Sequence, residues 1–276
     1  MLSFGRAITY SLVYMIGSLT FGFITIFPNP GVRSMRDEYP YFDSIVSSDS
    51  VRYFNSLTPL FATFGGFLIH ILIRYVFNNR RRIVICLLNI AGFIIWLLFL
   101  LITPEKWWIG IVLRSIQGLI LGGNATITPI LILEVAPIHL KGLFGGLAQI
   151  GKTTGFLIYY LTAAYKNWKS MIIIGAIICL IESVLIWLTP EHHDIIGINF
   201  NDNVKKKHNK CVHCNCNCNC NSRYESIFQR QYSFFLLSAM MMMVFQQFCG
   251  INAINANLSS IMINCGLNFN TNIESA

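Results

Sequence analysis

Seven long apolar stretches divide the chain, and polar segments separate them. They cover residues 7–27, 54–77, 83–103, 108–133, 143–164, 170–189 and 232–264. A helix that crosses the roughly 30 Å hydrocarbon core of a bilayer needs about 20 mostly apolar residues. Backbone polar groups have no water partner in lipid, so such stretches must close their hydrogen bonds within each segment, as a helix does. The pattern predicts an all-α, polytopic membrane helical bundle.

The composition agrees with this interpretation. Hydrophobic side chains make up 54% of the 276 residues and charged ones only 12%, about half the charged fraction of a typical soluble domain. The first apolar stretch is longer than the apolar core of a signal peptide and has no clear cleavage site. Soluble, disordered and secreted classes are therefore excluded.

The net charge of +8 follows the predicted topology. If the N-terminus lies inside, the inside segments hold about twice as many Lys and Arg residues as the outside ones. Cytoplasmic loops carry such an excess. We expect a plasma-membrane protein with a cytoplasmic N-terminus, with the lipid bilayer and not nucleic acid as the partner of its basic residues.

Two connections are long. Residues 28–53 are predicted to form an outside loop, and the chain is again polar from about 190 to 230. We expect three parts: a six-helix bundle over 1–190, a cytoplasmic linker over 191–230, and a seventh helix in 231–276 that begins a second half.

The linker carries an alternating Asn-Cys tract, Cys211–Cys220. Thiolates bind soft metals, but structural zinc sites use separated pairs of cysteines. We interpret the tract as a low-complexity repeat, with metal binding or palmitoylation as alternatives. No cofactor is expected.

Polar side chains within the spans are candidates for function. Among them we single out the amides Gln149, Gln246, Gln247 and Asn252. An amide offers donors and an acceptor together, which suits a neutral, hydroxyl-rich ligand. On one ideal helix the last three would not share a face, so we expect a break near Gly250. The alternative is that each amide simply bonds to a neighbouring helix.

Other intramembrane residues predict packing. Glycines spaced four apart predict close helix contacts at Gly118/Gly122, Gly142/Gly146 and Gly151/Gly155. Lys152 and Glu182 are the two charges that a mid-span ion pair would neutralise.

Several of these motifs occur together in one known family. Arg114-x3-Gly118-x3-Gly122 is followed by Pro129-x4-Glu134-Val-Ala-Pro137-x3-Lys141-Gly142, and later by Gln246-Gln247-x2-Gly250-Ile-Asn252-Ala. In this order the motifs resemble the sugar porters of the major facilitator superfamily. The resemblance implies the N-terminal six-helix half of that fold plus one further helix.

The resemblance also implies residue roles. Gln149, Gln246, Gln247 and Asn252 would bind a hexose-like sugar in a central cavity. Cytoplasmic ion pairs would hold one conformer: Arg81 and Arg82 beside Glu134, and Lys141 beside Glu191. The alternative for these charges is ordinary anchoring of loops.

Departures from the family pattern refine the prediction. Proton-coupled members carry an Asp where Ile24 stands, which favours facilitated diffusion. Family members have about twelve spans, and alternating access needs two bundles, so we expect an incomplete chain with a second porter half or a full-length porter as partner. The alternative is a non-transporting sugar sensor or membrane partner protein. No nucleophile–base pair appears in the spans, so an enzyme is not expected.

Overall fold

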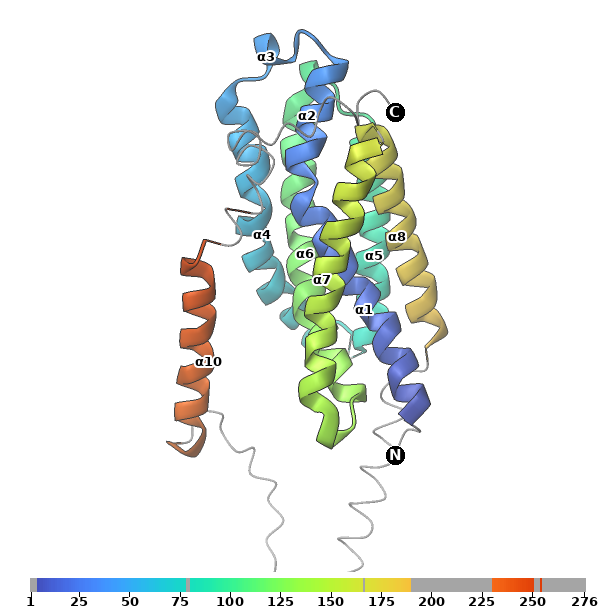
Figure 1. Cartoon of the computed structure of the whole chain (residues 1–276), viewed down its shortest axis with the longest axis vertical. Helices are drawn as coiled ribbons and strands as arrows, with labels where there is room; N and C mark the ends of the chain where they lie inside the picture. The colour runs from blue at the N-terminus through green and yellow to red at the C-terminus, as the bar shows by residue number, and fades with distance from the viewer. Residues whose placement is uncertain (1–3, 78–79, 166, 190–229, 251–253, 255–276) are drawn as a thin grey trace, which may run out of the picture. The chain divides into compact units, whose positions relative to one another are not determined.

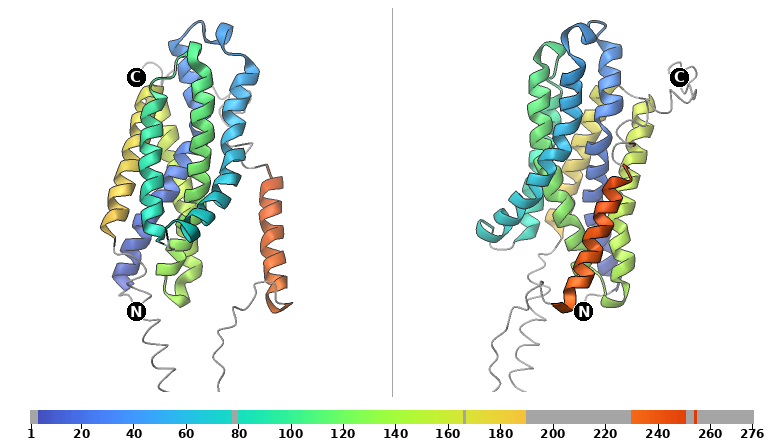
Figure 2. Two further views of the ribbon diagram at one scale, coloured as in Figure 1. Left: turned by 180° about the vertical axis from the view of Figure 1, so that it is seen from behind. Right: turned by 90° about the vertical axis from the view of Figure 1, so that its left-hand side faces the viewer.

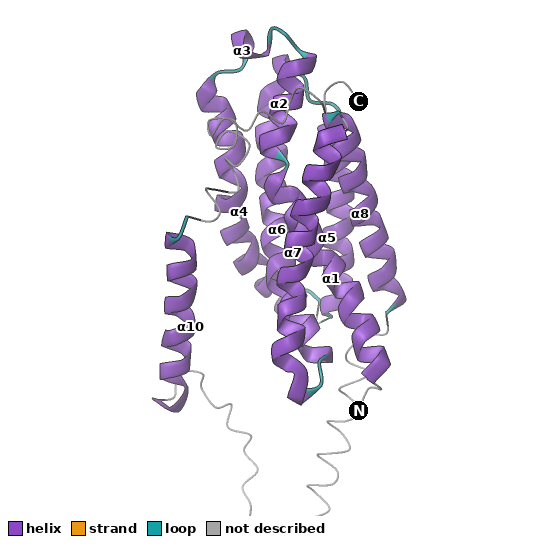
Figure 3. Ribbon diagram, in the orientation of Figure 1, coloured by secondary structure: helices purple, strands orange, loops and turns teal. Residues whose placement is uncertain are grey.

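The structure is a computed structural model that describes residues 4–77, 80–165, 167–189, 230–250 and 254, and these are almost entirely helical (Figures 1 and 3). The long helices are α1 (Phe4–Ile26), α4 (Ser48–Tyr75), α5 (Arg81–Phe99), α6 (Trp107–Val135), α7 (Lys141–Tyr165), α8 (Trp168–Leu188) and α10 (Arg230–Phe248). Each predicted apolar stretch contains one of them. The all-α prediction is confirmed.

Five helical segments of the described residues are long and apolar enough to cross a membrane. They are Gly5–Ile26, Ser48–Tyr75, Arg81–Phe99, Pro104–Val135 and Trp168–Leu188. Helix α7 is long but less apolar, because glycines, threonines, Gln149 and Lys152 interrupt it. The bundle is therefore that of a multi-pass membrane protein.

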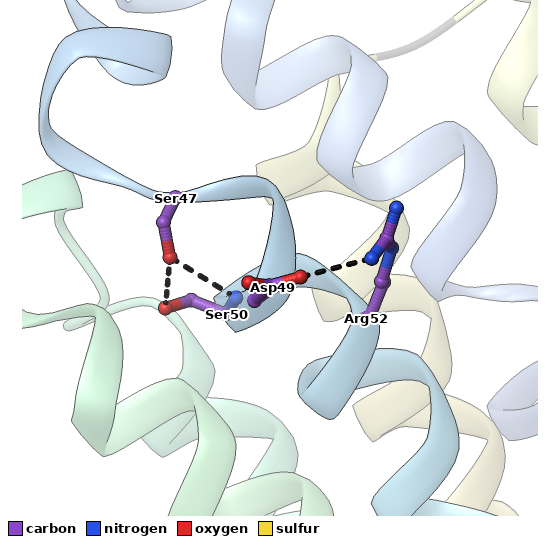
Figure 4. A network of polar contacts seen from close by, with 4 residues as sticks. All are labelled: Ser47, Asp49, Ser50 and Arg52. Atoms are coloured by element: carbon purple, nitrogen blue, oxygen red, sulfur yellow. Dashed lines mark hydrogen bonds and ion pairs between the residues drawn. The ribbon is translucent and has the colours of Figure 1, made fainter.

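The prediction of a loop over residues 28–53 was wrong. This segment forms α2 (Pro28–Glu38), the short α3 (Phe42–Ile45) and the start of α4. Both prolines of α2 lie in its first turn, where a missing N–H costs no helical hydrogen bond. The Ser47 hydroxyl caps α4 by accepting from the Ser50 N–H at 3.3 Å (Figure 4).

Successive long helices run in opposite directions in the first compact unit (Figure 2). The closest pairs are α4 with α6, α1 with α7 and α5 with α8, and α6 also packs on α1 and α5. We refer to the end with the α4–α5 and α6–α7 connections as the N-terminal end, because the N-terminus lies there. The opposite end carries α2 and α3.

Two of the three predicted glycine pairs lie in helix contacts. A Cβ on Gly118 or Gly122 would meet the backbone of α4 at Thr58 or Ala62, and one on Gly151 or Gly155 would meet the backbone of α1. Only hydrogen fits at such crossings. The third pair, Gly142/Gly146, was predicted to pack in the same way, but no other helix among the described residues has a heavy atom within 4 Å of a Cβ built on either residue.

The first unit has two apolar clusters. One, toward the α2–α3 end, gathers aromatic rings such as those of Phe27, Phe54 and Trp96. The other, toward the N-terminal end, is mostly aliphatic, with Ile85 and Ile132 at its centre. Helix α10 belongs to a second compact unit, His192–Leu258, and is described by itself.

Candidate functional site

An ion pair joins two elements at the N-terminal end of the first unit. Arg81, the first residue of α5, donates from Nη1 to Oε1 of Glu134, near the end of α6. The two side chains are 36% and 27% exposed, so they are partly shielded from solvent. The sequence placed these two residues together, and the structure has them in contact.

The neighbouring Arg82 reaches the end of α8. It donates to the backbone carbonyl of Thr189, and its guanidinium lies 5.3 Å from the centre of the Trp187 ring. Its cationic group therefore ties the start of α5 to the last turn of α8. Lys141 begins α7 and is exposed, while its expected partner Glu191 lies outside the described residues.

Gln149 lies on an exposed face of α7. Gly142, Gly146, Gln149 and Thr153 are spaced so that they share one side of the helix, and all four are exposed. We call this the Gln149 face. The Gln149 side chain forms no hydrogen bond with the described residues, whereas the Thr153 hydroxyl bonds back to its own helix. The amide is thus free of the neighbouring helices of its unit.

The other predicted sugar-binding amides belong to the second unit. Gln246 is exposed on α10, Gln247 is in the same helix, and Asn252 lies outside the described residues. Helix α10 ends at Phe248, and Gly250 has a φ of 67°, a left-handed conformation that glycine adopts without strain. The predicted break near Gly250 is confirmed.

Arg114 of α6 is a fully buried cation that the sequence showed only as part of a motif. Its Nη1 donates to the backbone carbonyl of Ile24 at 3.1 Å and to Oε1 of Gln117 at 2.6 Å. Its guanidinium lies 5.8 and 5.4 Å from the rings of Phe27 and Phe54. Arg114 is thus held by a backbone carbonyl, an amide oxygen and two ring faces.

The predicted pairing of Lys152 with Glu182 was wrong. The Lys152 ammonium lies 4.6 Å from the centre of the Phe21 ring on α1, a favourable site for a cation. Glu182 is enclosed at the contact of α8 with α1 and accepts from the Thr20 hydroxyl at 3.3 Å. The two charges thus have different neighbours and form no ion pair with each other.

A second polar junction, missed from the sequence, closes the α2–α3 end. Trp168 Nε1 donates to Glu38 Oε2 at 2.5 Å, the Trp168 N–H donates to Ser34 Oγ at 3.1 Å, and Lys169 also pairs with Glu38. These bonds hold α2 on the first turn of α8. The Lys169 hydrogen bond is the main cause that lowers the pKa of Glu38 from its ordinary value. The only signal in the sequence was the acidic pair Asp37-Glu38 at the end of α2.

No group of three His, Cys, Asp or Glu side chains within the described residues could hold a metal ion. The Cys211–Cys220 tract lies outside those residues. The chemistry of the described site is thus that of amides, glycines and ion pairs.

A profile of the Major Facilitator Superfamily matches residues 3–273. The chain belongs to this superfamily. The inward-open xylose transporter XylE from E. coli superposes with a TM-score of 0.65 at 18% identity, over 93% of this chain and 64% of XylE. That superposition confirms the predicted superfamily fold.

The curated relatives of this superfamily member are sugar transporters. Facilitated glucose transporter member 8 of solute carrier family 2 from Bos taurus is 26% identical over 177 residues, 64% of this chain and 36% of that protein. The facilitated trehalose transporter Tret1 of Apis mellifera ligustica is 27% identical over 181 residues, 66% and 35% of the two chains. The resemblance to sugar porters is confirmed, and the chain spans about a third of the length of these relatives.

Proposed function

We propose that this chain takes part in the transmembrane transport of a hexose-like sugar by facilitated diffusion through alternating access. The relatives are named for glucose and trehalose and the structural neighbour for xylose, so a small polyhydroxylated substrate is the common element. We further propose a plasma-membrane location with a cytoplasmic N-terminus, because the basic residues concentrate on that side.

The observation that carries the proposal is the Gln149 face. An amide turned toward lipid would lose its hydrogen bonds, so a face with Gln149 and Thr153 fits a water-filled cavity or another protein segment. Gly142 and Gly146 remove side-chain bulk from the same face, which leaves room for a ligand close to the helix. We propose that Gln246, Gln247 and Asn252 also bind sugar hydroxyls, because their amides offer the same donors and acceptor.

The Arg81–Glu134 pair would serve as a conformational lock. It joins the start of α5 to the end of α6 at the N-terminal end of the unit. Opening of a cavity toward that end would separate such charges, and a Lys141–Glu191 pair would act in the same way. These charges therefore bias one conformer and do not bind the sugar.

Facilitated diffusion is supported by the contacts at Ile24. Its side chain is buried and its carbonyl already accepts from Arg114. The position thus has no group that could carry a proton with the sugar.

The test is uptake of labelled D-hexoses into proteoliposomes that contain the protein at its native length, with L-glucose as the background. We expect saturable uptake that is independent of a pH gradient. Gln149→Leu removes the amide at similar size, and loss of one or two hydrogen bonds of about 0.5–1.5 kcal/mol each should weaken apparent affinity by roughly 3–100-fold.

The matched control is Leu161→Ala. Leu161 is also exposed on α7 but lies about three turns beyond Gln149, so its truncation should leave affinity unchanged. Equal effects of the two variants would reject the Gln149 face as the sugar site. Absence of uptake in every variant, with the protein correctly folded, would favour a non-transporting membrane protein.

A further inference from the structure

A layer of polar side chains separates the two apolar clusters of the first unit. On α5, Asn89 lies between Cys86 of one cluster and Ile95 of the other. The same alternation places three more polar residues between the clusters: Thr20 on α1, Asn124 on α6 and Glu182 on α8. The layer therefore lies in the middle of the bundle, away from both ends.

Glu182 is the acidic member of this layer. It has no exposed surface. Its Oε2 lies 3.3 Å from the Thr20 hydroxyl, whose one hydrogen is shared between this carboxyl oxygen and the Gly17 carbonyl at 2.8 Å. Its Oε1 lies against Gly17, 2.5 Å from where a Cβ would stand, and has no hydrogen-bond partner. One carboxyl oxygen is thus buried and unsatisfied.

Other polar atoms in the layer are also unsatisfied. Thr128 Oγ1 lies 3.0 Å from the same Cβ position of Gly17, so it faces the region that holds Glu182 Oε1. Asn124 donates to Asn89 at 2.9 Å, which leaves Asn124 Oδ1 without a partner. The layer thus holds an unsatisfied hydroxyl at Thr128, an unsatisfied amide donor at Asn89 Nδ2 and an unsatisfied amide oxygen at Asn124.

No basic side chain among the described residues forms an ion pair with Glu182. Lys152 lies over Phe21, Arg114 bonds to Ile24 and Gln117, and Arg82 bonds to Thr189. A buried carboxylate without a cation is strongly unfavourable.

We propose that Glu182 is a proton-binding site and that its carboxyl group is neutral in this conformation. A carboxylate only accepts hydrogen bonds, whereas a carboxylic acid also donates one. A proton on Oε1 removes the buried charge and turns an acceptor-only oxygen into a donor, while Oε2 keeps its contact with the Thr20 hydroxyl. Binding forms one O–H bond with a proton taken from water, and release returns that proton to water.

The titratable groups that face Glu182 agree with this assignment. Cys179 on α8 and Cys86 on α5 are its electrostatic neighbours, and buried thiols are neutral near pH 7. Helices α1 and α6 contribute Thr20 and Thr128, which do not ionise. No neighbour therefore supplies the positive charge that an ionised Glu182 requires.

A metal cation fits the layer less well than a proton. Hard cations take six or more oxygen ligands. Here the Thr20 hydroxyl is oriented as a donor to the carboxyl group, and the Asn89 amide also lies beside that group. The proposal does not depend on the proposed sugar transport, because the proton is held inside the bundle whether or not sugar moves.

The test is infrared spectroscopy of the purified full chain in lipid at neutral pH, in normal and heavy water. We expect a deuterium-sensitive C=O band of a protonated carboxylic acid that is lost in Glu182→Gln and kept in Glu105→Gln, an exposed acid outside the layer. Thr20→Val should move the band to higher frequency, because it removes the hydrogen bond to the carbonyl oxygen. This variant also assigns the band if Glu182→Gln does not fold.

Three results would overturn the proposal. The first is the absence of a protonated carboxyl band in the wild type at neutral pH. The second is a band that neither Glu182→Gln nor Thr20→Val alters. The third is a band that appears only when choline replaces sodium, since that would assign the site to a metal cation.

Discussion

The contrast between Gly122 and Gly146 gives the sharpest prediction about how the bundle is held together. Both belong to glycine pairs spaced four apart, and the sequence treats them alike. A Cβ on Gly122 would lie within 3.0 Å of the Ala62 backbone, 2.7 Å from its carbonyl carbon and 2.9 Å from its Cα. A Cβ on Gly146 would meet nothing within 4 Å.

Gly122→Ala should therefore force α4 away from α6. The obstacle is backbone, which cannot rotate aside as a side chain does, so the cost should be about 1–3 kcal/mol or more. Gly146→Ala adds only a methyl group to an open face and reduces the freedom of the unfolded chain. It should stabilise α7 by about 0.5–1 kcal/mol.

Thermal unfolding in a mild detergent, followed by size-exclusion chromatography of the heated protein, measures both effects. At roughly 2–4 °C per kcal/mol for a domain of this size, Gly122→Ala should lower the midpoint by several degrees and Gly146→Ala should raise it slightly. Equal shifts for the two variants would refute the assignment of Gly122 to the α4–α6 contact.

Two further predictions concern polar contacts at opposite ends of the unit. The Lys169 hydrogen bond lowers the pKa of Glu38 below its ordinary value of 4.5, so the ionised Glu38 stabilises the fold fully above that value, and this stabilisation is lost as the pH falls through the lowered pKa. Glu38→Gln should therefore be less stable than wild type at pH 7 and equally stable in acid. Thermal midpoints of the two proteins that stay apart in acid would contradict this. For Arg81 and Glu134, a double-mutant cycle of Arg81→Ala and Glu134→Gln should give a coupling of about 0.5–1 kcal/mol; strictly additive midpoints would mean that the pair contributes nothing.

Most of the secondary structure could be predicted from the sequence. A long helix lies at each apolar stretch. The break near Gly250 was expected because Gln246, Gln247 and Asn252 could not share one face of a continuous helix. The segment 28–53 was mispredicted because its polar composition signalled a loop. Pro28 and Pro30 instead lie in the first turn of α2, where proline is compatible with a helix.

The candidate site was only partly predictable. Glu134 and Arg81 were named from a family motif, and they are in contact. Lys152 and Glu182 were paired because they were the two unexplained charges in the spans. Lys152 instead contacts an aromatic ring and Glu182 a hydroxyl group, and neither neighbour is visible from spacing along one helix.

The sequence by itself determined that this chain is a bundle of membrane helices. A bilayer provides no partner for backbone N–H and C=O groups, so each long apolar segment must satisfy them internally, whatever its neighbours are. Only the tertiary structure decided which side of each helix meets another helix. That choice makes Gly122 a closely packed contact and leaves Gly146 open, because the space beside a residue depends on segments far away in the chain.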